Sequence, residues 1–295
     1  MIGPIFHSPR RGPRRTPLEP GTARRYKNLV IDLAEYALAP LGRWEKERLV
    51  VETVEIRLHR LAPAFDGYRI ALLTDPHLSP LVPRWWVERA VARTMELGAD
   101  LIVLGGDYVD DDPHYVSAVG EVLRPLRAPD GVVGVLGNHD HYVDASGVRA
   151  QLTASGVREL LNASMIVTRG GAGLAIAGVG DLQCDAIDFA RALDGVPEDV
   201  PRIVISHDPD VFGYWPNDRR LDLMLSGHTH GGQAWLPLIG PPFVPSQFGF
   251  RFLKGHILEG ERQLYVSRGV GASGVPIRWK CPPELTLAVL RPSHS

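Results

Sequence analysis

The sequence predicts an α/β protein in which short buried strands alternate with helices. Five short apolar runs, each bounded by Gly, Pro or Asp, have the length of strands that are covered on both faces. Between these runs lie stretches whose apolar residues recur with helical spacing, and such alternation is typical of α/β folds. A chain of 295 residues is long enough for one large core or two modest domains.

The composition is that of a globular protein. Hydrophobic residues make up 44% of the chain and charged residues 22%, which excludes the fibrous, wholly disordered and polytopic membrane classes. The net charge of −2 is unevenly distributed, because residues 1–27 hold seven basic residues and one acidic residue. This segment carries +6 and the remainder −8, so we expect no nucleic-acid partner for the acidic globule.

The N-terminal region predicts two elements. Residues 1–25 are rich in Arg, Pro and Gly and predict a basic disordered tail. Apolar residues spaced from Tyr26 to Trp44 predict an amphipathic helix within 26–48, too short and too charged to span a bilayer. This helix either packs on the following domain or lies on a membrane surface, where the basic tail would assist it.

The same region bears on localisation. Arg24-Arg25 before a partly apolar stretch resembles a twin-arginine export signal, but Asp32 and Glu35 interrupt the apolar stretch. We therefore expect a cytoplasmic protein, either free or peripheral at the inner face of the membrane, and not an exported one.

From residue 49 the pattern becomes that of an α/β domain, which we place at 49–295. A β-prone segment comes first and contains Val51, Val54, Ile56 and Leu58. The five predicted strands are Arg69–Thr74, Leu101–Leu104, Val132–Leu136, Ile203–Ile205 and Leu221–Leu225. The main predicted helices occupy 84–98, 114–124 and 146–155. No internal repeat and no Gly-rich phosphate-binding loop is found.

Each predicted strand runs into residues that can bind a metal. The segments that follow the five strands are Asp75-Pro76-His77, Gly105-Gly106-Asp107, Gly137-Asn138-His139-Asp140, Ser206-His207 and Ser226-Gly227-His228-Thr229-His230. In α/β proteins, sites form on the loops beyond the carboxyl ends of strands. We therefore expect these loops to build one site.

Local backbone features favour this site. We expect Gly106, Gly137 and Gly227 to let the backbone turn sharply before the ligand that follows each of them. Residues i and i+2 of an extended chain point to the same face. Two segments can therefore offer two ligands each, Asp75-Pro76-His77 and His228-Thr229-His230.

The donor set is selective for the type of metal. The candidate ligands are two carboxylates, one amide oxygen and four imidazoles, from Asp75, Asp107, Asn138, His77, His207, His228 and His230. Mixed nitrogen and oxygen donors suit Mn, Fe, Zn, Co or Ni, and not Ca or a structural cysteine site. Seven ligands exceed the need of one ion, so we expect two ions that share one carboxylate, an arrangement suited to attack at phosphorus.

The ordered motifs DxH, GGD, GNHD, H and GHTH resemble those of the calcineurin-like metallophosphoesterases. The resemblance extends from about residue 50 to residue 291. The segments Leu264–Gly271, Pro276-Ile277-Arg278 and Cys281–Glu284 are similar to a branch of small bacterial phosphodiesterases and UDP-diacylglucosamine pyrophosphatase-like proteins. The resemblance implies a four-layer α/β/β/α sandwich of two mixed sheets.

The resemblance also implies a role for each matching residue. One metal would be bound by Asp75, His77 and His230, the other by Asn138, His207 and His228, with Asp107 bridging the two. A hydroxide between the ions would be the nucleophile. His139 would stabilise the transition state and protonate the leaving oxygen, and Asp140 would orient the His139 ring.

The expected function is hydrolysis of a phosphodiester or pyrophosphate with two divalent ions, which we expect to be Mn, Fe or Zn. The substrate is either a small phosphate ester or a lipid-linked one, the latter if residues 1–48 contact a membrane. The alternatives are a membrane-associated lipid-nucleotide pyrophosphatase, a nuclease or cyclic-nucleotide phosphodiesterase, and a non-catalytic metal-dependent scaffold.

The candidate substrate contacts are His141, Trp235 and Arg278. The aromatic stretch 235–252 either packs on the fold or forms a rim that grips an apolar group. Arg278 either contacts a phosphate or is a buried ion-pair partner. The remaining residues of interest lack such context. We expect surface or core positions for His59, His114, His256 and His294, and we expect Cys184 and Cys281 to be reduced or buried.

Overall fold

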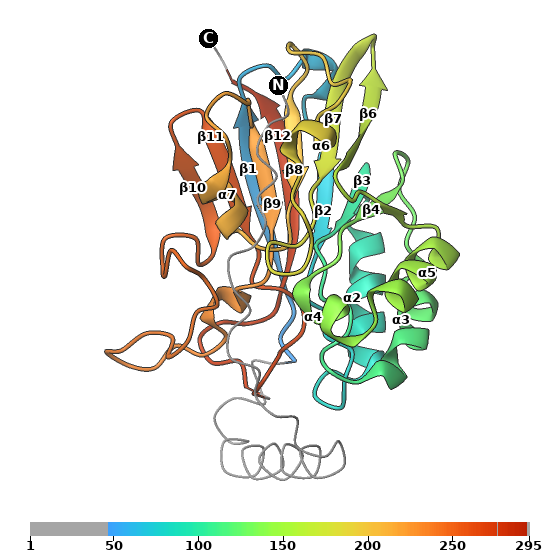
Figure 1. Ribbon diagram of the computed structural model, residues 1–295, viewed down its shortest axis with the longest axis vertical. Helices are drawn as coiled ribbons and strands as arrows, with labels where there is room; N and C mark the ends of the chain where they lie inside the picture. Colours follow the sequence, from blue (N-terminus) through green and yellow to red (C-terminus); the bar gives the residue numbers. More distant parts are fainter. Residues whose placement is uncertain (1–46, 276, 294–295) are drawn as a thin grey trace.

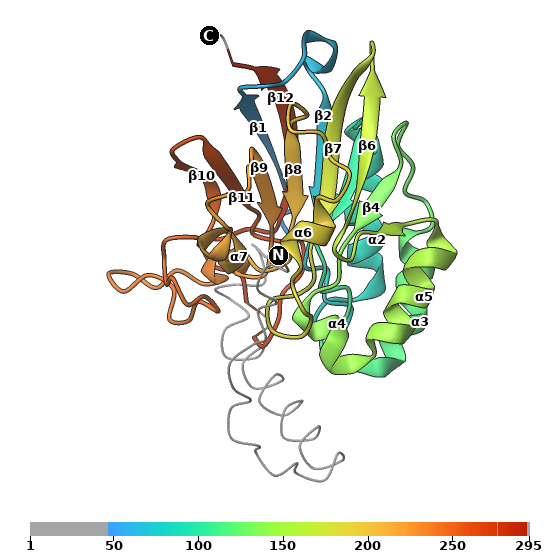
Figure 2. The same ribbon diagram turned by 45° about the horizontal axis from the view of Figure 1, so that its top comes forward.

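The computed structural model describes residues 47–275 and 277–293, in which two mixed β-sheets stack face to face with helices on both outer faces (Figure 1). Figure 2 shows the same layers from a second direction. The predicted α/β/β/α sandwich of two mixed sheets is confirmed. No helix in the described ranges is long and apolar enough to cross a membrane.

The first sheet contains six strands in the order β1-β12-β2-β3-β4-β5. Their bounds are β1 (Val50–Leu58), β12 (Glu284–Pro292), β2 (Arg69–Leu73), β3 (Leu101–Leu104), β4 (Val132–Gly134) and β5 (Arg158–Glu159). β12 lies between β1, to which it is parallel, and β2, to which it is antiparallel. β2, β3 and β4 are mutually parallel, so their carboxyl ends meet at one edge of the sheet.

The second sheet also contains six strands, in the order β10-β11-β9-β8-β7-β6. Their bounds are β6 (Ala163–Arg169), β7 (Ala172–Gly178), β8 (Arg202–Ile205), β9 (Leu223–Ser226), β10 (Gly255–Glu259) and β11 (Arg262–Val266). The four inner strands are parallel, and the edge strands β6 and β10 are antiparallel to their neighbours.

Helices cover the two outer faces. The α-helices are α2 (Arg84–Glu96), α3 (Val116–Leu123), α4 (Asn138–Val143), α5 (Ala145–Ser155), α6 (Phe189–Ala192) and α7 (Asp210–Tyr214). Short 3-10 helices occupy η1 (Pro63–Phe65), η2 (Pro113–Tyr115) and η3 (His230–Gly232). α5 shows why such helices begin and end where they do: the Asp144 carboxylate accepts the Gly147 N–H at its start, and Gly156 ends it in the left-handed conformation.

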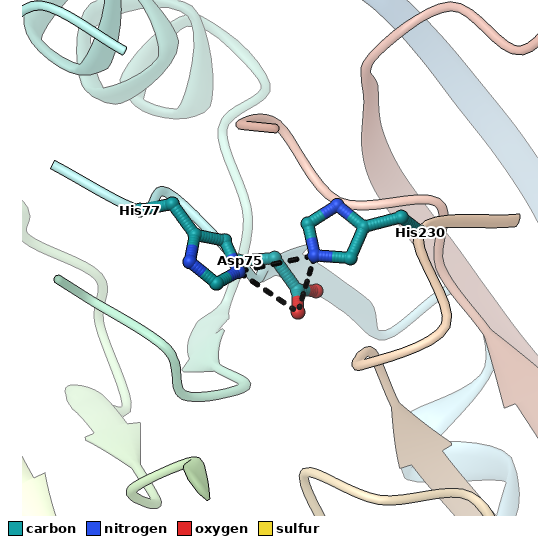
Figure 3. A group of neighbouring side chains, drawn as sticks. All are labelled: Asp75, His77 and His230. Atoms are coloured by element: carbon teal, nitrogen blue, oxygen red, sulfur yellow. Dashed lines mark hydrogen bonds and ion pairs between the residues drawn. The ribbon is translucent and has the colours of Figure 1, made fainter. Parts of the chain in front are cut away.

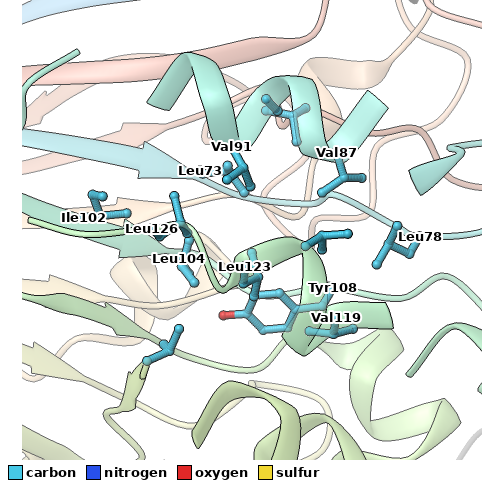
Figure 4. Packing of buried hydrophobic residues seen from close by; sticks show 14 of the residues in the cluster. Leu73, Leu78, Val87, Val91, Ile102, Leu104, Tyr108, Val119, Leu123 and Leu126 are labelled. Atoms are coloured by element: carbon cyan, nitrogen blue, oxygen red, sulfur yellow. The ribbon is translucent and has the colours of Figure 1, made fainter. Parts of the chain in front are cut away.

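Alternating side chains of each inner strand fill two different core layers. On β3, Ile102 and Leu104 pack against α2 and α3 (Figure 4), whereas Leu101 and Val103 face the second sheet. Strands with apolar residues on both faces follow from this double coverage. A third layer lies between the second sheet and the helices α6 and α7.

The five predicted strands and three predicted helices are present, with ends that differ from the prediction by at most two residues. The β-prone segment from residue 49 is β1. The sequence prediction did not identify β5, β6, β7, β10, β11 or β12 as strands. The predicted tail over 1–25 lies outside the described residues, as does nearly all of the helix predicted within 26–48.

Candidate metal centre

The loops beyond β2, β3, β4, β8 and β9 converge between the two sheets, as the strand-end pattern predicted. All seven candidate ligands on these loops are buried. Two groups of three donors, whose atoms lie within 4.8 Å of one another, can hold a metal: Asp75 with His77 and His230, and Asp107 with His207 and His228. A third such group, His77 with Asp107 and His139, shares one residue with each of them. The geometry therefore provides two neighbouring donor groups that combine residues from both sheets.

The first donor group joins the loop after β2 to η3 (Figure 3). Nε2 of His77 lies 3.0 Å from Nε2 of His230. The Asp75 Oδ1 atom lies 3.6 Å from the His230 nitrogen and 4.0 Å from the His77 nitrogen. Asp75 is itself held in place, because its Oδ1 accepts the His228 N–H and its Oδ2 accepts the Thr74 hydroxyl.

The second donor group joins β3, β8 and β9. Oδ2 of Asp107 lies 3.1 Å from Nε2 of His207, and that nitrogen lies 3.1 Å from Nδ1 of His228. Nδ1 of His207 faces the Gly105 carbonyl at 2.8 Å, which leaves Nε2 free to act as a ligand. Asn138 lines the same pocket as Asp107 and His228.

Asp107 lies between the two groups. Its Oδ2 atom is 3.4 Å from Nε2 of His77 in the first group and 3.1 Å from Nε2 of His207 in the second. Its other oxygen, Oδ1, accepts the backbone N–H of His139. Asp107 and His77 also form a group of close donors with His139, which connects the other two groups.

The backbone at the site is strained. Five of the candidate ligands have positive φ angles between 48° and 69°, and they are Asp75, His77, Asp107, His228 and His230. Non-glycine residues rarely adopt this left-handed conformation, and strain of this kind concentrates at functional sites. The expectation of extended i, i+2 pairs was therefore wrong, because all four residues of the two pairs have a left-handed backbone.

The three glycines that precede ligands act in two different ways. Gly106 has φ +94° and makes the sharp turn that we expected. Gly137 has φ −109°, but a Cβ there would lie 2.2 Å from Oδ1 of Asp107. A Cβ at Gly227 would lie 2.3 Å from Oδ2 of Asp75. At Gly137 and Gly227 glycine is therefore required by close packing against a ligand, and not by a turn.

The donors fit divalent ions. Ligands at bond lengths of about 2.0–2.2 Å around one ion lie roughly 3.0–3.5 Å apart. Two separations in the second group are 3.1 Å, and those in the first group are 3.0, 3.6 and 4.0 Å, so the second group has the tighter fit. Oδ1 of Asn138 is buried and has no hydrogen-bond partner. Burial, with the nearby His207, lowers the pKa of His228 to about 3, so this ring is neutral, as a metal ligand must be.

His139 lies at the edge of the two groups and lines the pocket. Its Nδ1 donates to the Asp110 carbonyl at 2.5 Å and lies 3.4 Å from the Asp110 carboxylate. The same carboxylate lies 3.3 Å from Nδ1 of His77 and accepts the Ser273 hydroxyl. Burial alone would raise the pKa of Asp110, but hydrogen bonds from His77 and Ser273 hold it at about 2.

The expected role of Asp140 is corrected by these contacts. Its two oxygens accept four backbone N–H groups, from Gly137, Asp107, Tyr108 and Val109. Asp140 therefore holds the loop that carries Asp107, and the carboxylate beside the His139 ring belongs to Asp110. Sequence reasoning missed Asp110 because it is the first of three consecutive aspartates, and nothing in the sequence distinguishes it from Asp111 and Asp112.

Arg278 does not reach the pocket, so the expected phosphate contact is wrong. Its side chain is fully buried, and its guanidinium donates to backbone carbonyls of two loops, including those of Gly271, Arg268 and His230. Nη2 also lies 3.1 Å from Nδ1 of His230. Arg278 therefore does not form the buried ion pair that was the alternative. Its hydrogen bonds instead hold together the loops that carry the first donor group.

A pocket of about 480 Å³ opens above the donors. Its remaining walls are formed by Gln183, Gln233, Ala234, Pro242, Phe243, Pro245, Ser273, Gly274 and Val275, among others. His141 is not part of this lining and pairs with Asp185 at 3.0 Å. Trp235 is not part of it either: its indole N–H donates to the Gly231 carbonyl. Neither placement supports the substrate contact expected for these two residues.

The aromatic stretch divides between both expected roles. Phe252 is buried, with its ring against Phe212, and Phe248 is partly buried. Phe243 and Phe250 are exposed, and Phe243 lines the pocket. Neither cysteine forms a disulfide within the described residues, and Cys184 is exposed whereas Cys281 is buried.

Fold and site together define a class of protein: a metallophosphoesterase, in which two stacked sheets place carboxylates and imidazoles at one edge. The family model described as calcineurin-like phosphoesterase matches residues 68–232, and the chain belongs to this family. It is accordingly a hydrolase of phosphate esters from a family that binds divalent metals.

Several relatives carry related names. The chain is 36% identical to phosphodiesterase YaeI of Escherichia coli (strain K12), over 80% of this chain and 88% of that protein. It is 32% identical to the uncharacterized metallophosphoesterase YkuE of Bacillus subtilis (strain 168), over 83% and 87% of the two chains. A transmembrane protein with metallophosphoesterase domain from Danio rerio is 31% identical over 88% of this chain and 60% of its own length.

Proposed function

We propose that the chain hydrolyses phosphodiesters or pyrophosphates with two divalent metal ions, of Mn, Fe or Zn. The observation that carries this proposal is the position of Asp107, whose Oδ2 lies 3.4 Å from a donor nitrogen of one group and 3.1 Å from a donor nitrogen of the other. A carboxylate in that position is suited to bridge two ions. The similarity to a protein named phosphodiesterase supports the choice of a diester.

The proposed ligands follow the two donor groups. One ion would be held by Asp75, His77 and His230, the other by Asn138, His207 and His228, and both by Asp107. When bound, such ions activate water as a nucleophile and offset negative charge on the phosphoryl group. The protein contributes the fixed geometry. The Thr74 hydroxyl, the Gly105 carbonyl and the Asp110 carboxylate contact the candidate ligands Asp75, His207 and His77 and fix their orientation.

His139 is the proposed general acid. Its Nδ1–H is taken up by the Asp110 carbonyl, so Nε2 is the ring nitrogen available for proton transfer. With the ring at the pocket wall, His139 would donate a proton to the oxygen of the leaving group and stabilise charge in the transition state.

Metal removal tests the proposal. The full-length chain is stripped with a chelator, its metal content is measured by mass spectrometry, and hydrolysis of bis-p-nitrophenyl phosphate is followed while Mn, Fe or Zn is returned. We expect turnover to fall to background without metal and to saturate at two ions per chain. Full activity of the metal-free protein, or saturation at one ion, would contradict the proposal.

Replacement of the general acid separates chemistry from metal binding. We expect His139→Ala to keep two ions per chain and to lose about 10²–10⁴-fold in turnover on substrates with poor leaving groups. The loss should be smaller for p-nitrophenolate, because this leaving group needs little protonation. Loss of metal from the variant would instead make His139 a ligand.

A further inference from the structure

The segment that leads from η3 towards β10 is free of charge. Residues 231–250 contain no Asp, Glu, Lys or Arg, in a chain of which 22% is charged. Within it, residues 234–245 form a loop that we call the lip. Figures 1 and 2 show this orange loop, which precedes β10, extending away from the two sheets as an arm.

Apolar side chains protrude at the end of the lip. Leu238 is fully exposed, and Ile239 and Phe243 are exposed by 72% and 73%. The tip is a tight turn closed by its own backbone, in which Leu236 and Gly240 exchange two hydrogen bonds of 3.0 Å. The tip is therefore a shaped protrusion and not a loop that packs on the domain.

The strained backbone of Leu238 is not offset by burial of its side chain. Its φ angle is +67°, a left-handed conformation that costs a non-glycine residue about 1–2 kcal/mol. Burial of a leucine side chain normally offsets such a cost, but this side chain is fully exposed. An apolar residue held in this way is suited to a contact outside the chain.

The lip is continuous with the mouth of the pocket. Pro242, Phe243 and Pro245 of the lip line the pocket together with the half-exposed Val275. Gln233, at the base of the lip, donates to the carbonyls of Ser273 and Val275 and so ties the two segments together. Whatever surface receives the tip therefore lies against the entrance to the metal centre.

The base of the lip carries an aromatic and basic collar. The Lys254 ammonium group lies 4.1 Å from the centre of the Trp235 ring, which is itself partly buried. The segment around Trp279 pairs with the lip at Ala234, and it carries an exposed basic residue, Lys280. Apolar side chains at a tip, with tryptophan and lysine behind them, match the apolar interior and anionic head groups of a bilayer in turn.

We propose that the lip docks on a lipid bilayer. Leu238, Ile239 and Phe243 enter the interface, Trp235 and Lys254 lie at the level of the head groups, and the pocket opens against the membrane. A narrow convex tip with few polar groups suits a bilayer better than a protein surface, which requires hydrogen-bond partners across a broad contact. On the proposed function, the substrate is then a phosphate ester carried by a lipid.

Vesicle flotation tests the docking without reference to activity. The full-length chain is floated with phosphatidylcholine vesicles, which carry no net charge and so remove electrostatic attraction of the basic N-terminal residues. We expect Leu238→Asp with Ile239→Asp to lower the partition coefficient about tenfold or more, given the transfer free energy of two apolar side chains. Asp tolerates the left-handed backbone at residue 238, so the fold should be retained.

A matched variant controls for the loss of exposed apolar area. Ile166→Asp with Leu258→Asp changes two exposed apolar residues, on β6 and β10, that lie outside the lip. This control should float like the unchanged chain. Equal flotation of the lip variant and the unchanged chain would overturn the proposal, as would failure of the unchanged chain to float.

Two further measurements exclude other occupants and link docking to the substrate. Dimers of the unchanged chain that the lip variant abolishes, without flotation, would make a second copy the occupant and overturn the proposal.

The lip variant should hydrolyse soluble bis-p-nitrophenyl phosphate normally and lose about tenfold on a long-chain alkyl p-nitrophenyl phosphodiester embedded in vesicles. Loss on both substrates would implicate the metal centre, whereas loss on neither would overturn the link between docking and substrate.

Discussion

At the scale of the residue, the two aspartates near His139 have separate tasks. Asp110 faces Nδ1 of both His77 and His139, and Asp140 accepts four backbone N–H groups. A carboxylate that touches two functional rings affects the reaction, whereas one buried among backbone donors affects the loop. Substitution of each should therefore give a different defect.

We expect Asp110→Asn to lower turnover or metal affinity about 10–100-fold, because the variant loses the charge behind two imidazoles. Thermal unfolding should change little. Asp140→Asn should instead lower the free energy of unfolding by about 2–5 kcal/mol. The substitution replaces one carboxylate oxygen by an NH2 group, which cannot accept the hydrogen bonds that this oxygen receives from backbone N–H groups. Calorimetry and steady-state kinetics on both variants measure these two effects. A loss of stability in Asp110→Asn and a loss of turnover in Asp140→Asn would contradict the roles assigned to the two aspartates.

Arg278 provides a second test at this scale. Its guanidinium satisfies backbone carbonyls that are buried in two loops, so Arg278→Met should cost at least about 2–3 kcal/mol of stability and weaken metal binding. KM for a phosphodiester should stay unchanged in the folded, metal-loaded variant. Arg84→Met removes a half-exposed surface arginine and serves as the control, with an expected cost below about 1 kcal/mol. A raised KM with unchanged metal affinity would instead support the contact between Arg278 and a substrate phosphate that we expected from the sequence.

At the scale of the element, the loops after the strands depend on close approach between neighbours. A Cβ at Gly137 would lie 2.2 Å from Oδ1 of Asp107, so Gly137→Ala must push a candidate bridging ligand aside. We expect this variant to fold, with a loss of about 1–3 kcal/mol in stability, and to lose most of its metal. Isothermal titration of the metal-free chain with Mn measures this effect.

The matched control lies on β7. A Cβ at Gly173 would meet only the ends of Ile166 and Val200 side chains, at 3.2 Å and beyond. Gly173→Ala should therefore retain its metal affinity. Equal metal affinity in the two variants would mean that the Asp107 loop relaxes freely around an added methyl group.

At the scale of the whole molecule, the C-terminal strand completes the first sheet. β12 pairs with β1 on one side and β2 on the other, and its Ala288 and Leu290 fill the layer between the sheets. Removal of residues 283–295 should leave β1 without a neighbour and prevent cooperative folding. A chain that lacks only residues 293–295 should unfold at the temperature of the full chain. Circular dichroism of both truncated chains decides the matter.

The sequence alone determined the class of fold and the set of candidate ligands. The apolar runs and the polar residues that follow them are local patterns, and strands buried on both faces produce such runs directly. The ordered motifs then identified which of the histidines and aspartates belong together. β12 and the edge hairpins were missed because their pairing partners lie far along the chain, and no local pattern records that pairing.

Only the tertiary structure decided how the neighbours of those ligands act. Asp110 supports His77 and His139, Asp140 holds a loop, and Arg278 clamps the carbonyls of distant segments. The lip, likewise, could be recognised as an exposed tip beside the pocket only once its side chains had positions. The physical reason is the same in each case: a motif specifies which donor atoms are present, whereas burial and the direction of each hydrogen bond depend on contacts between segments far apart in the chain.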